Sequence, residues 1–88
     1  MFEEGPSDKI LIERYIAGDR SSLAILVKRW HKTFCEKAFW VLKDKALAKD
    51  VAQETWIIII DKLHTLKKQQ SFKSWALRII YTLSLIHI

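Results

Sequence analysis

Apolar residues recur every three or four positions in four segments of this chain, a spacing typical of amphipathic helices. The first segment lies between Ser7 and Gly18, residue types that respectively cap and end helices. Its apolar positions are Ile10, Leu11, Ile12, Tyr15 and Ile16. The pattern predicts a short first helix.

A longer second segment follows the capping stretch that begins at Asp19. Its apolar stripe consists of Leu23, Leu26, Val27, Trp30, Phe34, Ala38 and Val41. Aromatic side chains at helical spacing mostly lie in a core, although an exposed one can stack on a nucleic-acid base. We therefore expect the core placement for the aromatic residues of this helix, which are Trp30, Phe34, Phe39 and Trp40.

Two further helices are predicted after Asp44 and after Ser71, with residues 67–70 as the loop between them. The inner positions of the third helix are Leu47, Val51, Thr55, Ile58, Ile59, Leu63 and Leu66. Those of the fourth are Phe72, Trp75, Ala76, Ile79 and Ile80. No segment alternates with the period of two that marks a strand. The predicted fold class is all-α, a compact bundle of about four helices with short loops.

The third predicted helix carries a polar face and more apolar surface than one core can bury. Asp50, Gln53 and Glu54 are three or four positions apart, so they are neighbours on one face. Trp56 and the isoleucines that follow it, Ile57 to Ile60, advance by about 100° each and point all round the helix. We expect some of this apolar surface to contact a partner. The acidic face also suits solvent alone, because carboxylates favour the positive end of a helix.

Composition places the chain among small folded domains. Its 88 residues allow one domain, half of them are hydrophobic, and 28% are charged. The formal net charge is +5, and no Asp or Glu occurs from Lys62 to Arg78. A basic segment of this kind suits an anionic partner such as nucleic acid, and it also suits a solvated helix end.

No chemistry of catalysis or metal binding stands out. Cys35 is the single cysteine, which excludes an internal disulfide and fits a reducing compartment. His31 lies four positions before it, but a structural zinc site needs about four ligands, and His64 and His87 are on distant segments. The N-terminus has no signal-peptide pattern, and no apolar run could span a membrane. We predict a cytoplasmic protein that is not an enzyme and needs no cofactor or metal.

Two sequence segments resemble motifs of a known family. They are Ala48-Lys49-Asp50-Val51-Ala52-Gln53-Glu54-Thr55-Trp56 and Phe72-Lys73-Ser74-Trp75-Ala76-Leu77-Arg78-Ile79. Their order and content are similar to the A-x-D-x-x-Q-E-x-F and F-x-x-W-L-x-x-I patterns in region 2 of sigma-70 family sigma factors, especially the extracytoplasmic-function (ECF) group. The resemblance covers residues 8–80, which leaves residues 1–7 as an N-terminal extension and 81–88 as an atypical apolar tail.

The resemblance implies two partners in transcription initiation. The third helix would dock on the coiled coil of the RNA polymerase clamp, and the segment after it would hold the non-template strand of the −10 promoter element. The implied polymerase-binding residues are Asp50, Gln53, Glu54, Trp56 and Ile60. The implied DNA-binding residues are Lys67, Lys68, Lys73, Trp75 and Arg78. For Trp75, core packing remains open as an alternative. An anti-sigma factor is a further implied partner.

The last residues depart from the family pattern. Thr82 stands where the family often has Asn, and the stretch from Tyr81 to Ile88 is nearly all apolar where polar and basic residues are usual. The family's second helical domain, for the −35 element, does not follow. We expect a truncated gene with a foreign tail that is partly exposed or packed on the first helix. The alternative function is a helical protein–protein interaction module or homodimeric adaptor without DNA binding, which would use the Ile57 to Ile60 surface.

Overall fold

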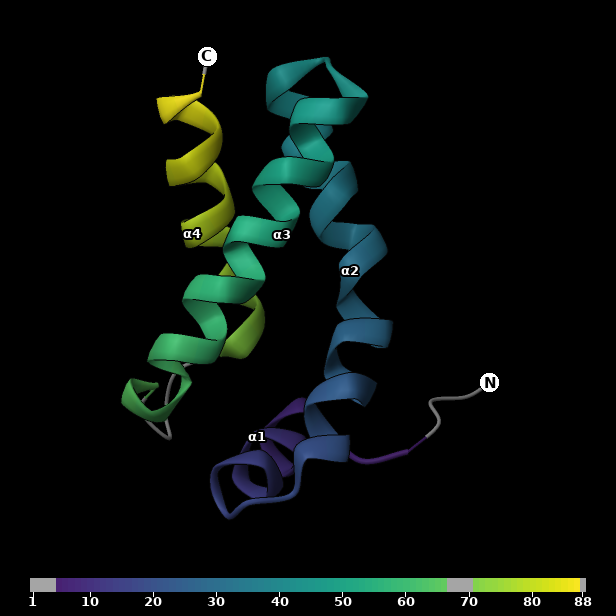
Figure 1. Cartoon of the computed structure of the whole chain (residues 1–88), viewed down its shortest axis with the longest axis vertical. Coiled ribbons are helices and arrows are strands. Elements are labelled where there is room, and N and C mark those ends of the chain that lie inside the picture. The colour runs from purple at the N-terminus through teal and green to yellow at the C-terminus, as the bar shows by residue number, and fades with distance from the viewer. Residues whose placement is uncertain (1–4, 67–70, 88) are drawn as a thin grey trace.

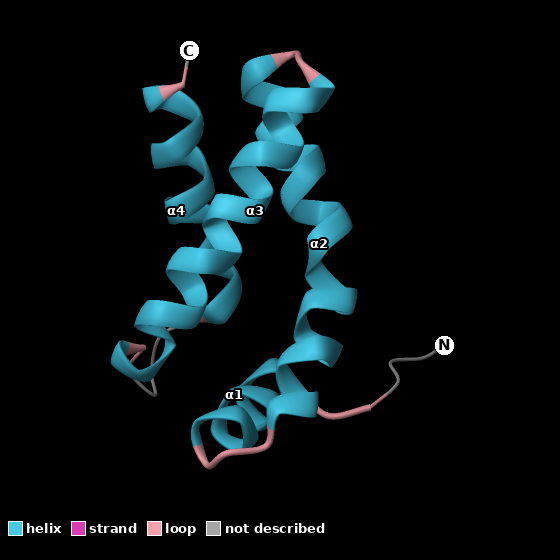
Figure 2. Cartoon of the chain, in the orientation of Figure 1, coloured by secondary structure: helices cyan, strands magenta, loops and turns pink. Residues whose placement is uncertain are grey.

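Four α-helices make up most of the chain in this computed structural model, which describes residues 5–66 and 71–87 (Figure 1). The helices are α1 (Asp8–Ile16), α2 (Arg20–Leu42), α3 (Lys45–Lys62) and α4 (Phe72–Ile86), and a single 3-10 turn, η1 (Leu63–Thr65), follows α3. The described residues contain no strand (Figure 2). The all-α prediction is confirmed. Among these residues, no helix combines the length and apolar character needed to cross a membrane.

Each helix begins where the sequence predicts, because a side chain accepts a hydrogen bond from a backbone N–H that the first turn leaves unpaired. The capping residues are Ser7, Asp19, Asp44 and Ser71, which accept from the backbone nitrogens of Ile10, Ser21, Leu47 and Ser74 at 3.3, 3.1, 3.0 and 3.3 Å. The hydroxyls of Ser21 and Ser22 also donate to Asp19, and these bonds lower the pKa of its carboxyl group.

The core lies where α2, α3 and α4 meet. α2 runs antiparallel to α3, α4 packs against both, and α1 folds across the beginning of α2 (Figure 1). Phe34 of α2 is fully buried at the centre of an aromatic cluster. Its ring centroid lies 4.9 Å from that of Trp56, 6.1 Å from that of Trp30 and 6.4 Å from that of Phe72. One residue from α2 therefore links α3 and α4.

Polar contacts of Pro6 and Asp8 with α2 attach α1 to that helix. Arg29 Nη1 and Trp30 Nε1 both donate to Asp8 Oδ1, at 2.9 and 3.0 Å, and Arg29 Nη2 donates to the carbonyl oxygen of Pro6 at 2.7 Å. Both charged side chains are about a quarter exposed. Leu11 and Ile12 supply the buried apolar contacts of α1, whereas Ile10 and Ile16, which the pattern also included, are exposed.

The prediction that all four aromatic residues of α2 lie in the core is wrong for two of them. Phe39 is 38% exposed and Trp40 is 72% exposed. The residue that faces the core in this turn is Ala38, which is fully buried. The next two positions are rotated from it by about 100° and 200°, so their side chains point away from the core.

The inner stripe of α3 agrees with the prediction at Val51, Thr55, Ile59 and Leu63, which are buried, and differs from it at the beginning of the helix. Leu47 is 36% exposed, and its neighbour Ala48 is buried instead. Ala48 and Ala52 are small residues on the buried face of α3, which permits close packing of the backbone against its neighbours. The sequence pattern, which favours large apolar residues, missed these positions.

The apolar tail continues α4. Leu83 packs against the core and Ser84 is fully buried, while Leu85 and Ile86 are 65% and 69% exposed. The expectation of a partly exposed tail is confirmed. The alternative that was left open, packing on the first helix, does not occur, because the C-terminal end of α4 lies at the end of the molecule opposite α1 (Figure 1).

Candidate functional site

The polar residues of the predicted motif lie on the outward side of α3. Asp50, Gln53 and Glu54 are all exposed, as their spacing predicts. Their orientation is fixed from the opposite side of the helix, where Val51 and Thr55 are fully buried. The Thr55 hydroxyl donates to the carbonyl oxygen of Val51 at 2.7 Å, which satisfies the one polar group that this buried side chain carries.

Two isoleucines extend this polar surface toward the end of α3. Ile57 is 68% exposed and Ile60 is 43% exposed, while Ile59 is fully buried. The prediction that these isoleucines cannot all face the core is confirmed. Ile57 lies four positions after Gln53 and three before Ile60, so all three share one side of the helix. We call the set Asp50, Gln53, Glu54, Ile57 and Ile60 the outer face of α3.

The sequence motif did not single out Ile57 as a contact residue. It is nevertheless the most exposed apolar residue of α3. The signal that could have identified it is its spacing from Gln53, which places it on the side of the helix that the polar motif already marked as exposed.

Trp56, which the resemblance implied as part of the polymerase-contact surface, lies largely in the core of this chain. Its side chain is only 7% exposed, and its Nε1–H donates to His31 Nδ1 at 3.2 Å. Its ring also packs on Phe34. Trp56 therefore holds α3 against α2 and orients the outer face from beneath.

The side chains of His31 and Cys35, which lie next to Trp56, make their polar contacts within the protein. Because His31 Nδ1 accepts from Trp56, a neutral imidazole carries its proton on Nε2, which lies 3.6 Å from Cys35 Sγ. Burial raises the pKa of the Cys35 thiol, which keeps it protonated at neutral pH. Within the described ranges, no three side chains of metal-ligating type come together.

A histidine at the end of α4 contacts the outer face. His87 Nε2 lies 3.5 Å from Glu54 Oε1, with both side chains well exposed. A polar contact so open to solvent contributes about 1 kcal/mol or less, even where both groups are charged. A partner that binds the outer face would therefore displace His87 from Glu54 at little energetic cost.

The described residues of the basic segment lie on α4. Lys73 and Arg78 are exposed, and Trp75 is partly buried with its ring centroid 6.2 Å from that of Phe72. Trp75 and Arg78 are three positions apart and share a side of the helix. Lys73 is five positions before Arg78, hence rotated from it by about 140°. The structure thus brings Trp75 and Arg78 together and separates Lys73 from them.

Lys67 and Lys68, the other predicted DNA-binding residues, lie outside the described residues. The nearest described positions are Leu66, which is partly buried, and Ser71, which caps α4.

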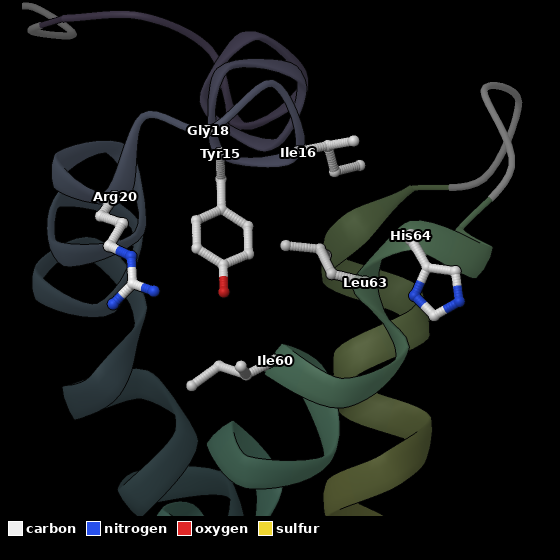
Figure 3. A pocket seen from close by; sticks show the side chains of 7 residues that line it. All are labelled: Tyr15, Ile16, Gly18, Arg20, Ile60, Leu63 and His64. Carbon is white, nitrogen blue, oxygen red and sulfur yellow. The ribbon is translucent and has the colours of Figure 1, made fainter.

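A pocket of about 340 Å³ adjoins the apolar end of the outer face, between α1, the start of α2 and the end of α3 (Figure 3). Its lining residues are Tyr15, Ile16, Gly18, Arg20, Ile60, Leu63 and His64. The Tyr15 ring extends from α1 toward Ile60 (Figure 3). Because Ile60 belongs both to the pocket and to the outer face, the two form one continuous surface.

The fold and these surfaces define a class of protein. The Sigma-70 region 2 family matches residues 26–88, and the chain belongs to this family. The match includes α3 and α4 with their motifs, and it runs through the apolar tail. The sequence-based resemblance is confirmed.

A curated relative and a solved structure agree with this assignment. The chain is 31% identical over 55 residues to the ECF RNA polymerase sigma factor SigX of Bacillus subtilis (strain 168), a match that covers 62% of this chain and 28% of that protein. The chain thus spans less than a third of this relative. The fold matches, with a TM-score of 0.86, the NMR structure of the complex formed by an engineered region 2 of sigmaE in complex with GTAAAA. That match has 23% identity and covers 98% of this chain and 90% of the other.

Proposed function

We propose that this chain is the core-binding and promoter-melting module of an ECF sigma factor. The outer face of α3 docks on the coiled coil of the RNA polymerase clamp, and α4 with the segment before it holds the unpaired non-template strand of the −10 element. The observation that carries the proposal is the exposure of Asp50, Gln53 and Glu54 in line with Ile57 and Ile60 on a helix whose other side is buried.

The outer face combines the two kinds of contact that a helical partner requires. The carboxylates of Asp50 and Glu54 can accept charge-assisted hydrogen bonds from arginines of the clamp, and such bonds are about twice as strong as neutral ones. Ile57 and Ile60 add an apolar patch that loses its water on docking. The relative's description as an RNA polymerase sigma factor supports this partner.

The α4 surface offers contacts for a single strand. Arg78 can pair with a phosphate, while the exposed part of Trp75 beside it can stack on a base. Extruding a base costs a few kcal/mol, which stacking and phosphate contacts must offset. The neighbouring fold is of a region 2 bound to GTAAAA, which supports DNA as the ligand. The proposed activity is binding alone, without catalysis or cofactor, and takes place in the cytoplasm with the polymerase.

The clamp contact is tested by replacing Gln53 with Ala and Asp50 with Lys in one chain. Binding to the isolated clamp coiled coil, measured by calorimetry, should weaken, and the melting temperature should hardly change because surface substitutions usually stay within about 0.5 kcal/mol. Lys62→Ala, a change at an exposed position nine residues after Gln53 and therefore on the opposite side of α3, is the matched control. A large loss of stability with unchanged binding would show that the outer face is structural.

The DNA contact is tested by the salt dependence of single-strand binding. Arg78→Ala should lower the affinity for a −10-like strand and reduce the slope of log K against log salt by about 0.7, the value for one phosphate on single-stranded DNA. Lys45→Ala removes an exposed cation at the beginning of α3 that is not among the proposed DNA-binding residues, and it should leave the slope unchanged. Equal slopes for the Arg78 variant and the unmodified chain would exclude Arg78 from the site.

The exposed isoleucines also support the second candidate, a homodimeric or adaptor module without DNA binding. The specific observation is the 68% exposure of Ile57. This function predicts that Ile57→Asp abolishes self-association in sedimentation and that the unmodified chain has no affinity for single-stranded DNA at any salt concentration.

A further inference from the structure

A second hollow lies between α2 and α4, away from the outer face of α3. It has a volume of about 400 Å³ and is lined by Glu36, Lys37, Trp40 and Tyr81. Trp40 is 72% exposed and Tyr81 is 37% exposed. Two large aromatic rings that are open to solvent on two different helices and line one hollow form an exposed apolar patch, a feature that marks binding surfaces.

The charges around this hollow are mainly positive. Lys37 lines it, and Lys43 Nζ lies 4.4 Å from the centroid of the Trp40 ring. Lys43 ends α2 in a left-handed backbone conformation, with φ of 57°. A residue other than Gly is uncommon in that conformation. At this position the Lys43 ammonium group lies beside the exposed indole of Trp40. Glu36 is the one acidic residue of the lining.

The hollow is continuous with the proposed DNA-binding side of α4. Tyr81 follows Arg78 by three positions, so the two side chains are neighbours, about 4.5 Å apart along the helix axis. A single strand that pairs a phosphate with Arg78 would next pass Tyr81, which lines the same hollow as Trp40. Arg78, Tyr81 and Trp40 thus follow one path across the molecule.

We propose that Trp40 and Tyr81 form a second base-binding subsite for an unpaired nucleotide of the same strand. The base stacks on the aromatic rings, and Lys37 and Lys43 approach the flanking phosphates. The Glu36 carboxylate accepts a hydrogen bond from an exocyclic amino group, so the subsite favours adenine or cytosine over thymine, which has no such group. This inference rests on the proposed function, since it extends the path that begins at Arg78.

The residues favour nucleic acid over a protein as the occupant. Cores of protein–protein interfaces are depleted in lysine, whereas aromatic rings interleaved with basic side chains are typical of surfaces that bind single strands. Of the three ionic side chains at the hollow, Lys37, Lys43 and Glu36, two are positive.

The test is equilibrium binding of single-stranded oligonucleotides of about twelve nucleotides, containing only dA, dC or dT, to the full chain. Trp40→Ala should weaken binding of the dA and dC strands about 5- to 150-fold, the range that corresponds to loss of one stacked base. Trp40→Phe should retain most of the affinity. Phe39→Ala is the matched control, because Phe39 is also exposed on α2 but does not line this hollow. Circular dichroism verifies that each variant is folded.

The failure of this inference is distinct from failure of the proposed function. If Arg78→Ala weakens binding while Trp40→Ala and Tyr81→Ala do not, the path ends at Arg78 and the second subsite is refuted. If the unmodified chain binds none of the strands, the proposed function itself fails. A loss of self-association in Trp40→Ala, with DNA binding intact, would assign the hollow to a protein contact and also overturn the inference. Equal affinity for dA, dC and dT would refute the role of Glu36.

Discussion

Replacing Phe34 with Ala should remove a large share of the stability of this domain. The side chain is fully buried, and its ring packs on those of Trp30, Trp56 and Phe72. A buried Phe→Ala change lowers the free energy of unfolding by about 3–5 kcal/mol. At about 0.05–0.15 kcal/mol per residue, a chain of this length has about 4–13 kcal/mol in total. The melting temperature should therefore fall by at least about 12 °C.

The assay is urea denaturation followed by circular dichroism, with the unfolding slope checked for each variant. Trp40→Ala truncates another large aromatic residue of the same helix and should change the free energy of unfolding by less than about 0.5 kcal/mol. Phe34→Leu should lie between Phe34→Ala and the unmodified chain, because it keeps volume but loses the aromatic contacts. Equal costs for Phe34→Ala and Trp40→Ala would refute the division between buried and exposed aromatic residues.

Three further outcomes are expected. Asp8→Ala should lower the free energy of unfolding by about 1 kcal/mol in thermal melts, since a partly exposed acceptor of two hydrogen bonds is lost. Glu13→Ala on the same helix should have no effect in the same measurement. Equal effects of the two changes would show that the polar contacts of Asp8 do not hold α1 on α2. The lowered pKa of Asp19 means that its contribution to stability is present above its unfolded pKa and is lost as pH falls through its folded pKa; Asp19→Asn should flatten that acid-side loss of melting temperature, and an unchanged profile would contradict the assignment. Deleting residues 85–88 should leave helicity intact and reduce self-association in sedimentation, because Leu85 and Ile86 are exposed, whereas unfolding on this deletion would show that these residues belong to the core.

The beginnings of the helices could be predicted because their determinants are local. A cap such as Asp44 acts on a backbone N–H only three residues away, so the sequence around it contains the whole interaction. The burial of a side chain, in contrast, is not determined by the residues next to it in the sequence. Phe34 and Trp40 are similar residues on one helix, and which of them is covered depends on where α3 and α4 come to lie. The sequence pattern of α2 alone does not contain that information.

The candidate site likewise has one part that could be predicted from the sequence and one part that could not. The exposure of Asp50, Gln53 and Glu54 follows from their spacing on one helix. The burial of Trp56 follows from contacts with His31 and Phe34, which are more than twenty positions away along the chain. The contact between His87 and Glu54 likewise joins distant segments. Sequence reasoning therefore identified the polar residues of the outer face and Ile60, but it did not single out Ile57 and did not foresee the burial of Trp56.

The length of α3 has a consequence for how the two proposed surfaces work together. Its outer face begins near the N-terminal end at Asp50, and the chain that leads to the DNA-binding residues departs from its C-terminal end at Lys62. A helix of this length spans about 27 Å without a joint. In the proposed function, α3 therefore fixes both the distance and the orientation of the promoter strand relative to the polymerase. Substitutions beyond Lys62 could then alter which bases are captured without moving the point of attachment.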